Sequence, residues 1–259
     1  MAERFSLYIP GDGPLHRLNP ITKLVLAVCV LAVSFLAPGY WTASIVFFGL
    51  LLPLSAWGRI LVPFLSGVSR ILLPLALILL VIHGVFNPAY PTVLFQVWIF
   101  SVKQEGVAFA YLVASRIACM LGASLLLLFT THPSALMSAL TERGLPSSLA
   151  YVVVSVLQII PVMQARVQTI LDAQRARGLE TEGSLRVRAG AIVPLVVPLV
   201  LGSLLDVEER AMVLESRAFR AHRAKTSLIE IRDTPRQRAF RIGIVVTAIL
   251  CIGARAWLS

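Results

Sequence analysis

Two stretches of the same design decide the fold: LAYVVVSVLQIIPVMQARVQTILDAQRARG, residues 149–178, and AGAIVPLVVPLVLGSLLDVEERAMVLESRAFR, residues 189–220. Each begins apolar and becomes charged. The apolar part of the first stretch, residues 149–162, is too short to cross a bilayer, which takes about 20 apolar residues. No strong breaker follows Pro161, so we expect one helix about 45 Å long. Half of it would lie against membrane-embedded protein, and half would project into the cytosol.

Each stretch ends on an arginine between two small residues, as Ala176-Arg177-Gly178 and as Ser216-Arg217-Ala218. A guanidinium with small flanks, at the end of a rigid helix, suits a partner pocket that is lined by carboxylates. The alternative is a solvated basic helix end, which interacts favourably with the helix dipole. Because glycine adopts left-handed conformations far more readily than alanine, the second helix end is less well defined by its sequence.

The composition is that of a polytopic membrane protein. Of the 259 residues, 58% are hydrophobic and only 14% are charged, whereas a soluble domain is nearer half apolar and a quarter charged. Most basic residues fall within residues 131–241, mixed with acids, which indicates the cytoplasmic face beside anionic lipid. Because the signs alternate there, nucleic acid is not the expected partner.

We expect an all-α membrane protein with about five transmembrane helices and a cytoplasmic coupling domain of long, partly amphipathic helices. Residues 1–130 would form an N-terminal membrane domain with four spans, residues 131–238 the coupling domain, and residues 239–259 a last transmembrane helix. The chain would cross its membrane several times. The expected spans are residues 21–37, 41–57, a segment from about residue 71 to 86 after a short interfacial piece, 106–129 and 239–258.

Several local signals complete this outline. Asn19 before Pro20 is typical of a helix start. Residues 87–105 have the composition of a hairpin or re-entrant segment outside the membrane. Residues 131–143 predict a short helix that Gly144 and a following proline end. Arg116 lies inside an expected span. It would serve there as a gate, as a contact for a partner, or as a buried anchor that bonds helix carbonyls.

The motifs of self-contained chemistry are missing. The sequence has no G-x-x-x-x-G-K-[ST], H-E-x-x-H or G-x-S-x-G motif, no paired carboxylates within a span and no Cys/His cluster. We therefore expect no catalytic residue and no metal site. Energy for transport would arrive through partner proteins.

The chain resembles the transmembrane T component of energy-coupling factor transporters. LHRLNPITKL at residues 15–24 is similar to that family's N-terminal signature, and the two arginine tripeptides are similar to its paired Ala-Arg-Gly motifs. The first tripeptide is identical to the Ala-Arg-Gly motif. The second differs from the motif at the residues on both sides of its arginine. The resemblance covers nearly the whole chain.

The resemblance implies a scaffold for an ATP-driven importer of a vitamin or a transition-metal ion, in the inner membrane of a bacterial or archaeal cell. The two tripeptides would dock into two ATP-binding-cassette subunits, which would bind ATP and magnesium, so this chain needs no cofactor of its own. A small substrate-binding membrane subunit would rest on the apolar halves of the long helices. That surface would comprise Leu149, Val153, Val156, Ile160, Val193, Val197 and Leu201.

Two other functions remain open from the residues alone. A self-contained channel or secondary carrier would rely on Arg116 and residues 87–105. An intramembrane enzyme is disfavoured by the missing catalytic motifs.

Overall fold

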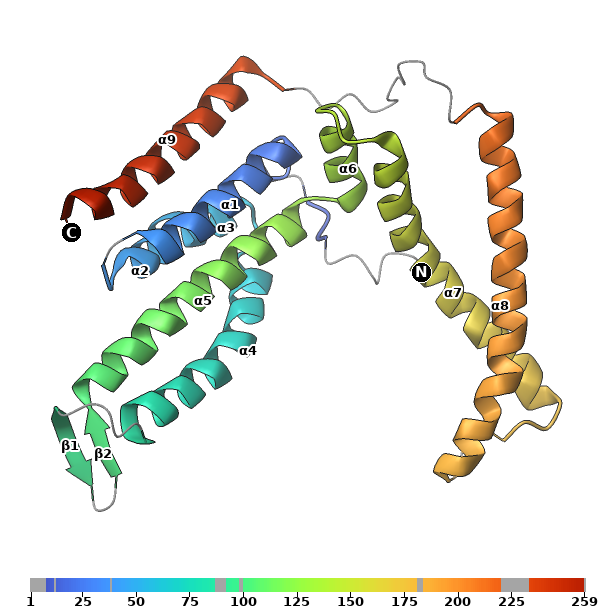
Figure 1. Cartoon of the computed structure of the whole chain (residues 1–259), viewed down its shortest axis with the longest axis horizontal. Coiled ribbons are helices and arrows are strands. Elements are labelled where there is room, and N and C mark those ends of the chain that lie inside the picture. Colours follow the sequence, from blue (N-terminus) through green and yellow to red (C-terminus); the bar gives the residue numbers. More distant parts are fainter. Residues whose placement is uncertain are drawn as a thin grey trace. The chain divides into compact units, whose positions relative to one another are not determined.

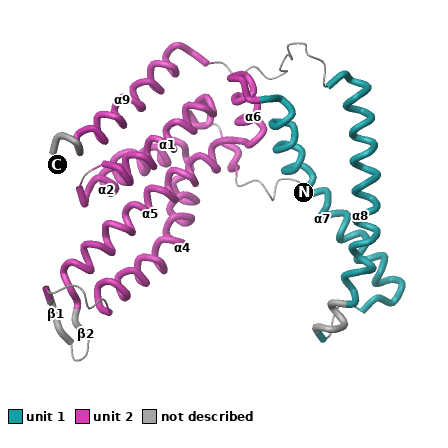
Figure 2. The backbone as a smooth tube through the Cα atoms, viewed as in Figure 1, with its two compact units in different colours: residues 1–5, 146–230 teal, residues 6–145, 231–259 magenta. Residues whose placement is uncertain are grey.

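The computed structural model describes residues 8–11, 13–37, 39–86, 92–97, 100–180, 184–219 and 233–258. By its contacts the chain divides into two compact units, which Figure 2 colours separately. One comprises residues 1–5 and 146–230. The other comprises residues 6–145 and 231–259.

The larger unit consists of helices and one hairpin (Figure 1). Its elements are α1 (Pro20–Leu36), α2 (Thr42–Val46), the π-helical η2 (Phe47–Leu51), α3 (Leu52–Trp57), α4 (Leu61–Leu79), the π-helical η3 (Leu80–Phe86), β1 (Val93–Val97), β2 (Phe100–Lys103), α5 (Gln104–Thr130), α6 (Pro133–Thr141) and α9 (Pro235–Leu258). The smaller unit contains α7 (Ser147–Ala176) and α8 (Leu185–Ser216). Helix α8 begins before the expected start at residue 189.

Helix α5 is the centre of the larger unit and packs against α1 and α4. Leu51, Phe64, Cys119 and Leu126 are fully buried in the core beside it. Gly122 permits this approach, because a Cβ there would lie 3.0 Å from Leu51 and 3.2 Å from Phe64.

The start of α1 is tied to the end of α5. Asn19 caps α1 as the sequence predicts, its Oδ1 accepting from the backbone N–H of Ile21 at 2.9 Å. Lys23, only 3% exposed, donates from Nζ to the carbonyl of Thr130 at 2.7 Å. The lysine thereby satisfies a carbonyl in the last turn of α5, where the helix leaves such groups without partners.

Residues 61–86 form one continuous helical segment, so the expected short interfacial piece before a span at residue 71 is wrong. Pro63 lies in the first turn, where no backbone donor is needed. Pro74 lies inside α4, which tolerates the lost hydrogen bond and becomes π-helical at Leu80. The expected hairpin is present as β1 paired antiparallel with β2. Residues 87–91 lie outside the described residues.

Five described helices are long and apolar enough to cross a membrane: Leu61–Phe86, Gln104–Thr130, Ser147–Ala176, Gly190–Ser216 and Pro235–Ala254. The first two expected spans are shorter apolar helices, at Pro20–Leu36 and Thr42–Trp57. The all-α membrane class expected from composition is confirmed.

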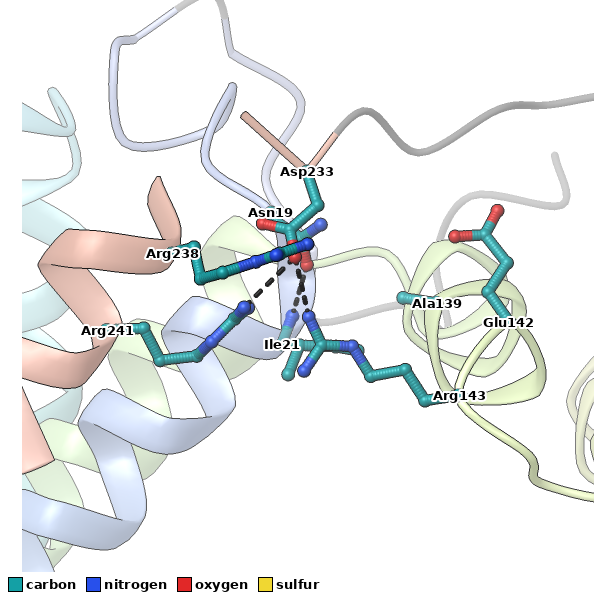
Figure 3. A pocket seen from close by; sticks show the side chains of 8 residues that line it. All are labelled: Asn19, Ile21, Ala139, Glu142, Arg143, Asp233, Arg238 and Arg241. Carbon is teal, nitrogen blue, oxygen red and sulfur yellow. Dashed lines mark hydrogen bonds and ion pairs between the residues drawn. The ribbon is translucent and has the colours of Figure 1, made fainter. Parts of the chain in front are cut away.

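Asp233 connects the end of α6 to the start of α9 (Figure 3). Its Oδ2 accepts from Nη2 of Arg143 at 2.8 Å and from Nη2 of Arg241 at 3.0 Å. The hydrogen bond from Arg241 lowers the pKa of the Asp233 carboxyl, and the charges of Arg241, Arg143 and Arg238 lower it further. One carboxylate thus connects residues almost a hundred positions apart in the sequence.

Replacing Asp233 by Asn should destabilise the larger unit in a pH-dependent way. Because the folded pKa lies below the usual value of 3.8, the carboxylate stabilises the fold above that pH. Its contribution is lost as the pH falls through the lowered folded pKa. At pH 7 we expect the melting temperature of Asp233→Asn to fall by a few degrees, since a partly exposed ion pair contributes about 1 kcal/mol. Thermal unfolding of both proteins from pH 7 to 3 measures this difference, which should shrink below about pH 4. A constant difference across that range would contradict the assignment.

Candidate partner-docking site

Helices α7 and α8 run antiparallel, as their side-chain contacts show. Tyr151, near the start of α7, contacts Phe219 beyond the end of α8, with ring centroids 5.2 Å apart. Gln174, near the end of α7, contacts Pro194 near the start of α8. Figure 1 shows that the two helices cross, and these side-chain contacts pair each apolar half with the charged half of the other helix.

An ion pair joins the helices at their middle, where both apolar halves end. Arg166 of α7 contacts Asp206 of α8 through Nη1 at 2.7 Å and through Nη2 at 3.2 Å. The side chain of Arg166 lies over Gly202, where a Cβ would be 3.2 Å from Nη1. Both charged side chains are about one-third exposed, at 31% and 33%. We name these three residues the crossing contact.

A proline in α8 supplies another contact between the helices. Pro198 has no N–H, so the carbonyl of Pro194 four residues earlier has no intrahelical donor. Gln174 of α7 donates to that carbonyl from Nε2 at 3.1 Å. The proline that weakens α8 locally therefore creates an acceptor that α7 uses.

Arg177 and Arg217 occupy equivalent positions at the ends of α7 and α8. Both are C-caps, with φ and ψ of −88° and 5° for Arg177 and −89° and 10° for Arg217. In α7, Leu179 donates to the carbonyl of Gln174 at 3.0 Å, and Gly178 donates to that of Arg175 at 2.9 Å. This pattern is the Schellman motif.

The same motif ends α8 although its left-handed residue is Ala218. Phe219 donates to Leu214 at 3.0 Å, and Ala218 donates to Glu215 at 2.9 Å. The φ of Ala218 is 52°, against 89° for Gly178. A left-handed conformation costs a non-glycine residue about 1–2 kcal/mol. The second helix end, which its sequence defined less well, is therefore formed under local strain.

Helix α6 ends with a third arginine in this motif. Leu145 donates to Leu140 at 3.1 Å, and Gly144 has a φ of 102°. Arg143 before it forms the ion pair with Asp233. Arg177 and Arg217 differ, because both side chains are exposed and form no ion pair with another described residue. Of the three arginines at these helix ends, the two that were expected to dock partners are therefore the ones whose side chains are exposed and form no ion pair with a described residue.

The two arginines lie at opposite ends of the helix pair. The contact of Phe219 with Tyr151 places Arg217 beside the first turns of α7. Arg177 follows at the other end of that helix, so about 40 Å separates the two positions along α7. The distance between Arg177 and Arg217 could not be predicted from the sequence, because it depends on the antiparallel contact of α7 with α8.

The residues expected to meet a substrate-binding subunit are all exposed. Their exposed fractions range from 39% for Ile160 to 64% for Val193. Among the described residues of this unit, only Ala150 and Ala191 are buried. The helix pair consequently presents apolar side chains that its own contacts leave uncovered: Leu149, Val153, Val156, Ile160, Val193, Val197 and Leu201.

Sequence reasoning missed the crossing contact, and it did not relate Arg143 to the other two arginines. The repeated order of arginine, small residue and large apolar residue, in Arg143-Gly144-Leu145 and Arg177-Gly178-Leu179, was an available signal. Arg116 lies in the larger unit, with its guanidinium 6.0 Å from the ring centroid of Phe35. No cluster of metal-ligating side chains occurs in the described parts of the chain.

Ala218 and Gly178 are the residues with left-handed backbone at the ends of α8 and α7. Replacing each by the residue type of the other should change the stability of the two helix ends in opposite directions. Ala218→Gly should relieve strain and slow amide hydrogen exchange at Phe219. Gly178→Ala should introduce strain and accelerate exchange at Leu179 by up to about tenfold, as expected for about 1–2 kcal/mol. Hydrogen exchange followed by mass spectrometry measures both, with the α6 end as an internal reference. Equal or reversed changes would contradict the cap assignment.

Comparisons with known proteins identify the family that this sequence resembles. The sequence model of the CbiQ family, described as cobalt transport protein, matches residues 11–228. The energy-coupling factor transporter transmembrane protein EcfT of Brevibacillus brevis is 30% identical over 96% of both chains. The proteins of the same name from Bacillus subtilis and Listeria innocua are 27% and 31% identical, over 96% and 87% of this chain and 97% and 89% of their own. This chain therefore belongs to the family of energy-coupling factor transporter transmembrane proteins.

Proposed function

We propose that this chain is the coupling subunit of an ATP-driven importer and that its two exposed arginine caps dock two ABC-type ATPase subunits. As a member of its family it is a membrane protein and a transporter component. The docking residues are Ala176, Arg177 and Gly178 at one end and Ser216, Arg217 and Ala218 at the other. ATP and magnesium would bind to the partners.

The observation that carries this proposal is the equivalence of the two caps at opposite ends of one helix pair. Each cap fixes the backbone at the base of a guanidinium and leaves the side chain exposed. An exposed arginine suits bidentate contact with a carboxylate of another protein. Two equivalent tips about 40 Å apart suit two similar partners better than one.

The antiparallel arrangement disfavours α7 and α8 as ordinary spans, although each is long and apolar enough. The apolar first half of α7 lies beside the part of α8 that carries Asp206, Glu208, Glu209 and Arg210. Burying that part in lipid would cost about 2.5–3.5 kcal/mol for each charge at the membrane centre. An orientation in which the pair lies along the membrane surface, against another protein, avoids this cost.

The uncovered apolar side chains of α7 and α8 would hold the small substrate-binding membrane subunit. On α7 they follow helical spacing, at Leu149, Val153, Val156 and Ile160, so they share one face. Nucleotide-driven motion of the ATPases would move the helix pair and hence that subunit. The substrate would be a vitamin or a transition-metal ion, which accords with the cobalt transport in the family's description.

Reversing the charge of the arginine caps should disconnect the ATPases. Because a lost interfacial charge pair costs about 2–5 kcal/mol, Arg177→Glu and Arg217→Glu should each reduce co-purification of ATPase subunits more than tenfold. The double variant should abolish uptake while the chain still inserts. Affinity purification from membranes followed by a substrate uptake assay measures both effects.

Arg210→Glu is the matched control, since Arg210 lies on α8, is exposed and forms no ion pair with a described residue. It should leave co-purification unchanged. Normal uptake by the Arg177→Glu/Arg217→Glu double variant would refute the docking role. Uptake by the purified chain alone, without nucleotide, would favour a self-contained carrier instead.

The crossing contact should affect the coupling of ATP hydrolysis to transport more than it affects the binding of the partner subunits. Arg166→Asp and Asp206→Arg each place like charges at the crossing, and each should reduce substrate transported per ATP hydrolysed severalfold. The charge-swapped double variant should restore most of it, although a pair that is one-third exposed contributes only about 1 kcal/mol. Paired transport and ATPase assays on the reconstituted complex measure the ratio. Asp172→Asn, on the exposed surface of α7, is the control. Failure of the swap to restore coupling in a folded complex would exclude a positioning role.

A further inference from the structure

The larger unit contains a basic hollow that neither the family nor the proposed function assigns. It has a volume of about 510 Å³. Residues from the start of α1, the end of α6 and the start of α9 line it (Figure 3): Asn19, Ile21, Ala139, Glu142, Arg143, Asp233, Arg238 and Arg241.

Three guanidinium groups face this hollow, and Asp233 balances only part of their charge. Its Oδ2 accepts from Arg143 and Arg241. The Arg241 side chain is 12% exposed, and its buried Nη1 has no acceptor among the described residues. Arg238 is exposed and forms no ion pair with a described residue. Glu142, the other acid, is exposed and forms none either. Among the described residues, the hollow therefore retains an unpaired donor and a net positive charge for an anion, beside one unpaired acceptor, the buried Oδ1 of Asp233.

Two helix starts add to this potential. Helix α1 begins at Pro20 and α9 begins at Pro235, so the N-terminal ends of both lie at the hollow. The N-terminus of a helix carries a partial positive charge, equivalent to about half an elementary charge. The arginines and the helix dipoles thus favour the same kind of ligand.

The position of the hollow along α9 indicates where that anion comes from. Residues Pro235–Ala254 of α9 can cross a membrane. Arg238 and Arg241 lie in the first two turns of this segment, where basic residues mark the cytoplasmic boundary. Phospholipid phosphates lie at that level, and basic pockets between transmembrane helices on this side bind anionic head groups.

We propose that this hollow binds the phosphate of an anionic phospholipid of the inner leaflet. Arg241 donates from its free Nη1, and Arg238 donates from the rim. Asp233 and Arg143 hold Arg241 in position. The lipid would join α9 to the ends of α1 and α6. This proposal does not depend on the docking of ATPases.

The test uses the full chain in nanodiscs that contain equal amounts of phosphatidylglycerol and phosphatidylcholine, with native mass spectrometry of the lipids that remain bound. The wild type should retain phosphatidylglycerol preferentially. Arg238→Gln should reduce that preference about fivefold, because one arginine near the surface contributes about 1 kcal/mol. Arg238→Gln removes an exposed side chain and should leave the fold intact, whereas Arg241→Gln also breaks the bond to Asp233.

Arg236→Gln is the matched control, because Arg236 lies on the same turn of α9 but does not line the hollow. An equal loss from Arg236→Gln, or no preference in the wild type, would overturn the site. A second arm adds inorganic phosphate to the same nanodiscs. Displacement of phosphatidylglycerol by inorganic phosphate would show a site for a soluble anion and would overturn the lipid assignment. Unchanged retention supports it.

Discussion

The antiparallel contact of α7 with α8 is the constraint on which the rest of the candidate site depends. Each helix is apolar in one half and charged in the other, so a parallel pair would place both apolar halves together. In the observed antiparallel pair, the apolar half of each helix faces the charged half of the other. The helices contact each other where both apolar halves end, at Arg166 and Asp206. This arrangement places the arginine caps at opposite ends and leaves apolar surface on both helices.

The larger unit differs in character from this pair. It has an interior centred on α5, a buried lysine that satisfies a helix-terminal carbonyl, and an aspartate shared by two arginines. The smaller unit has almost no interior among its described residues. A pair of long helices that exposes valine and leucine along its length is stable only when something covers it, which is typical of a component built into an assembly. Membership of a transporter family agrees with this physical requirement.

Much of the fold could be predicted from local pattern. Asn19-Pro20 indicated the start of α1, and the length of α7 followed from the lack of a strong breaker after Pro161. The expected short interfacial piece before residue 71 was wrong, because Pro63 lies in a first turn, where proline costs little, and Pro74 is tolerated inside one continuous helical segment. An internal proline is therefore a poor guide to helix ends in this chain. The docking tripeptides themselves stay a prediction, since only a complex with partners tests them.

The direction in which α8 passes α7, by contrast, depends on side chains 20 to 68 positions apart and could not be read from periodicity. Neither could the link from Asp233 to Arg143, since 90 residues separate them. Local sequence also failed to show that Ala218 would adopt the conformation that Gly178 adopts freely.

The alanine at that position makes the two tips of the helix pair unequal. Glycine holds the first tip without strain, whereas the second stores a small excess energy in its backbone. We therefore expect the last turn of α8 to open more often than that of α7. If the proposed function holds, two identical ATPase partners would meet one rigid helix end and one more flexible helix end on the same subunit.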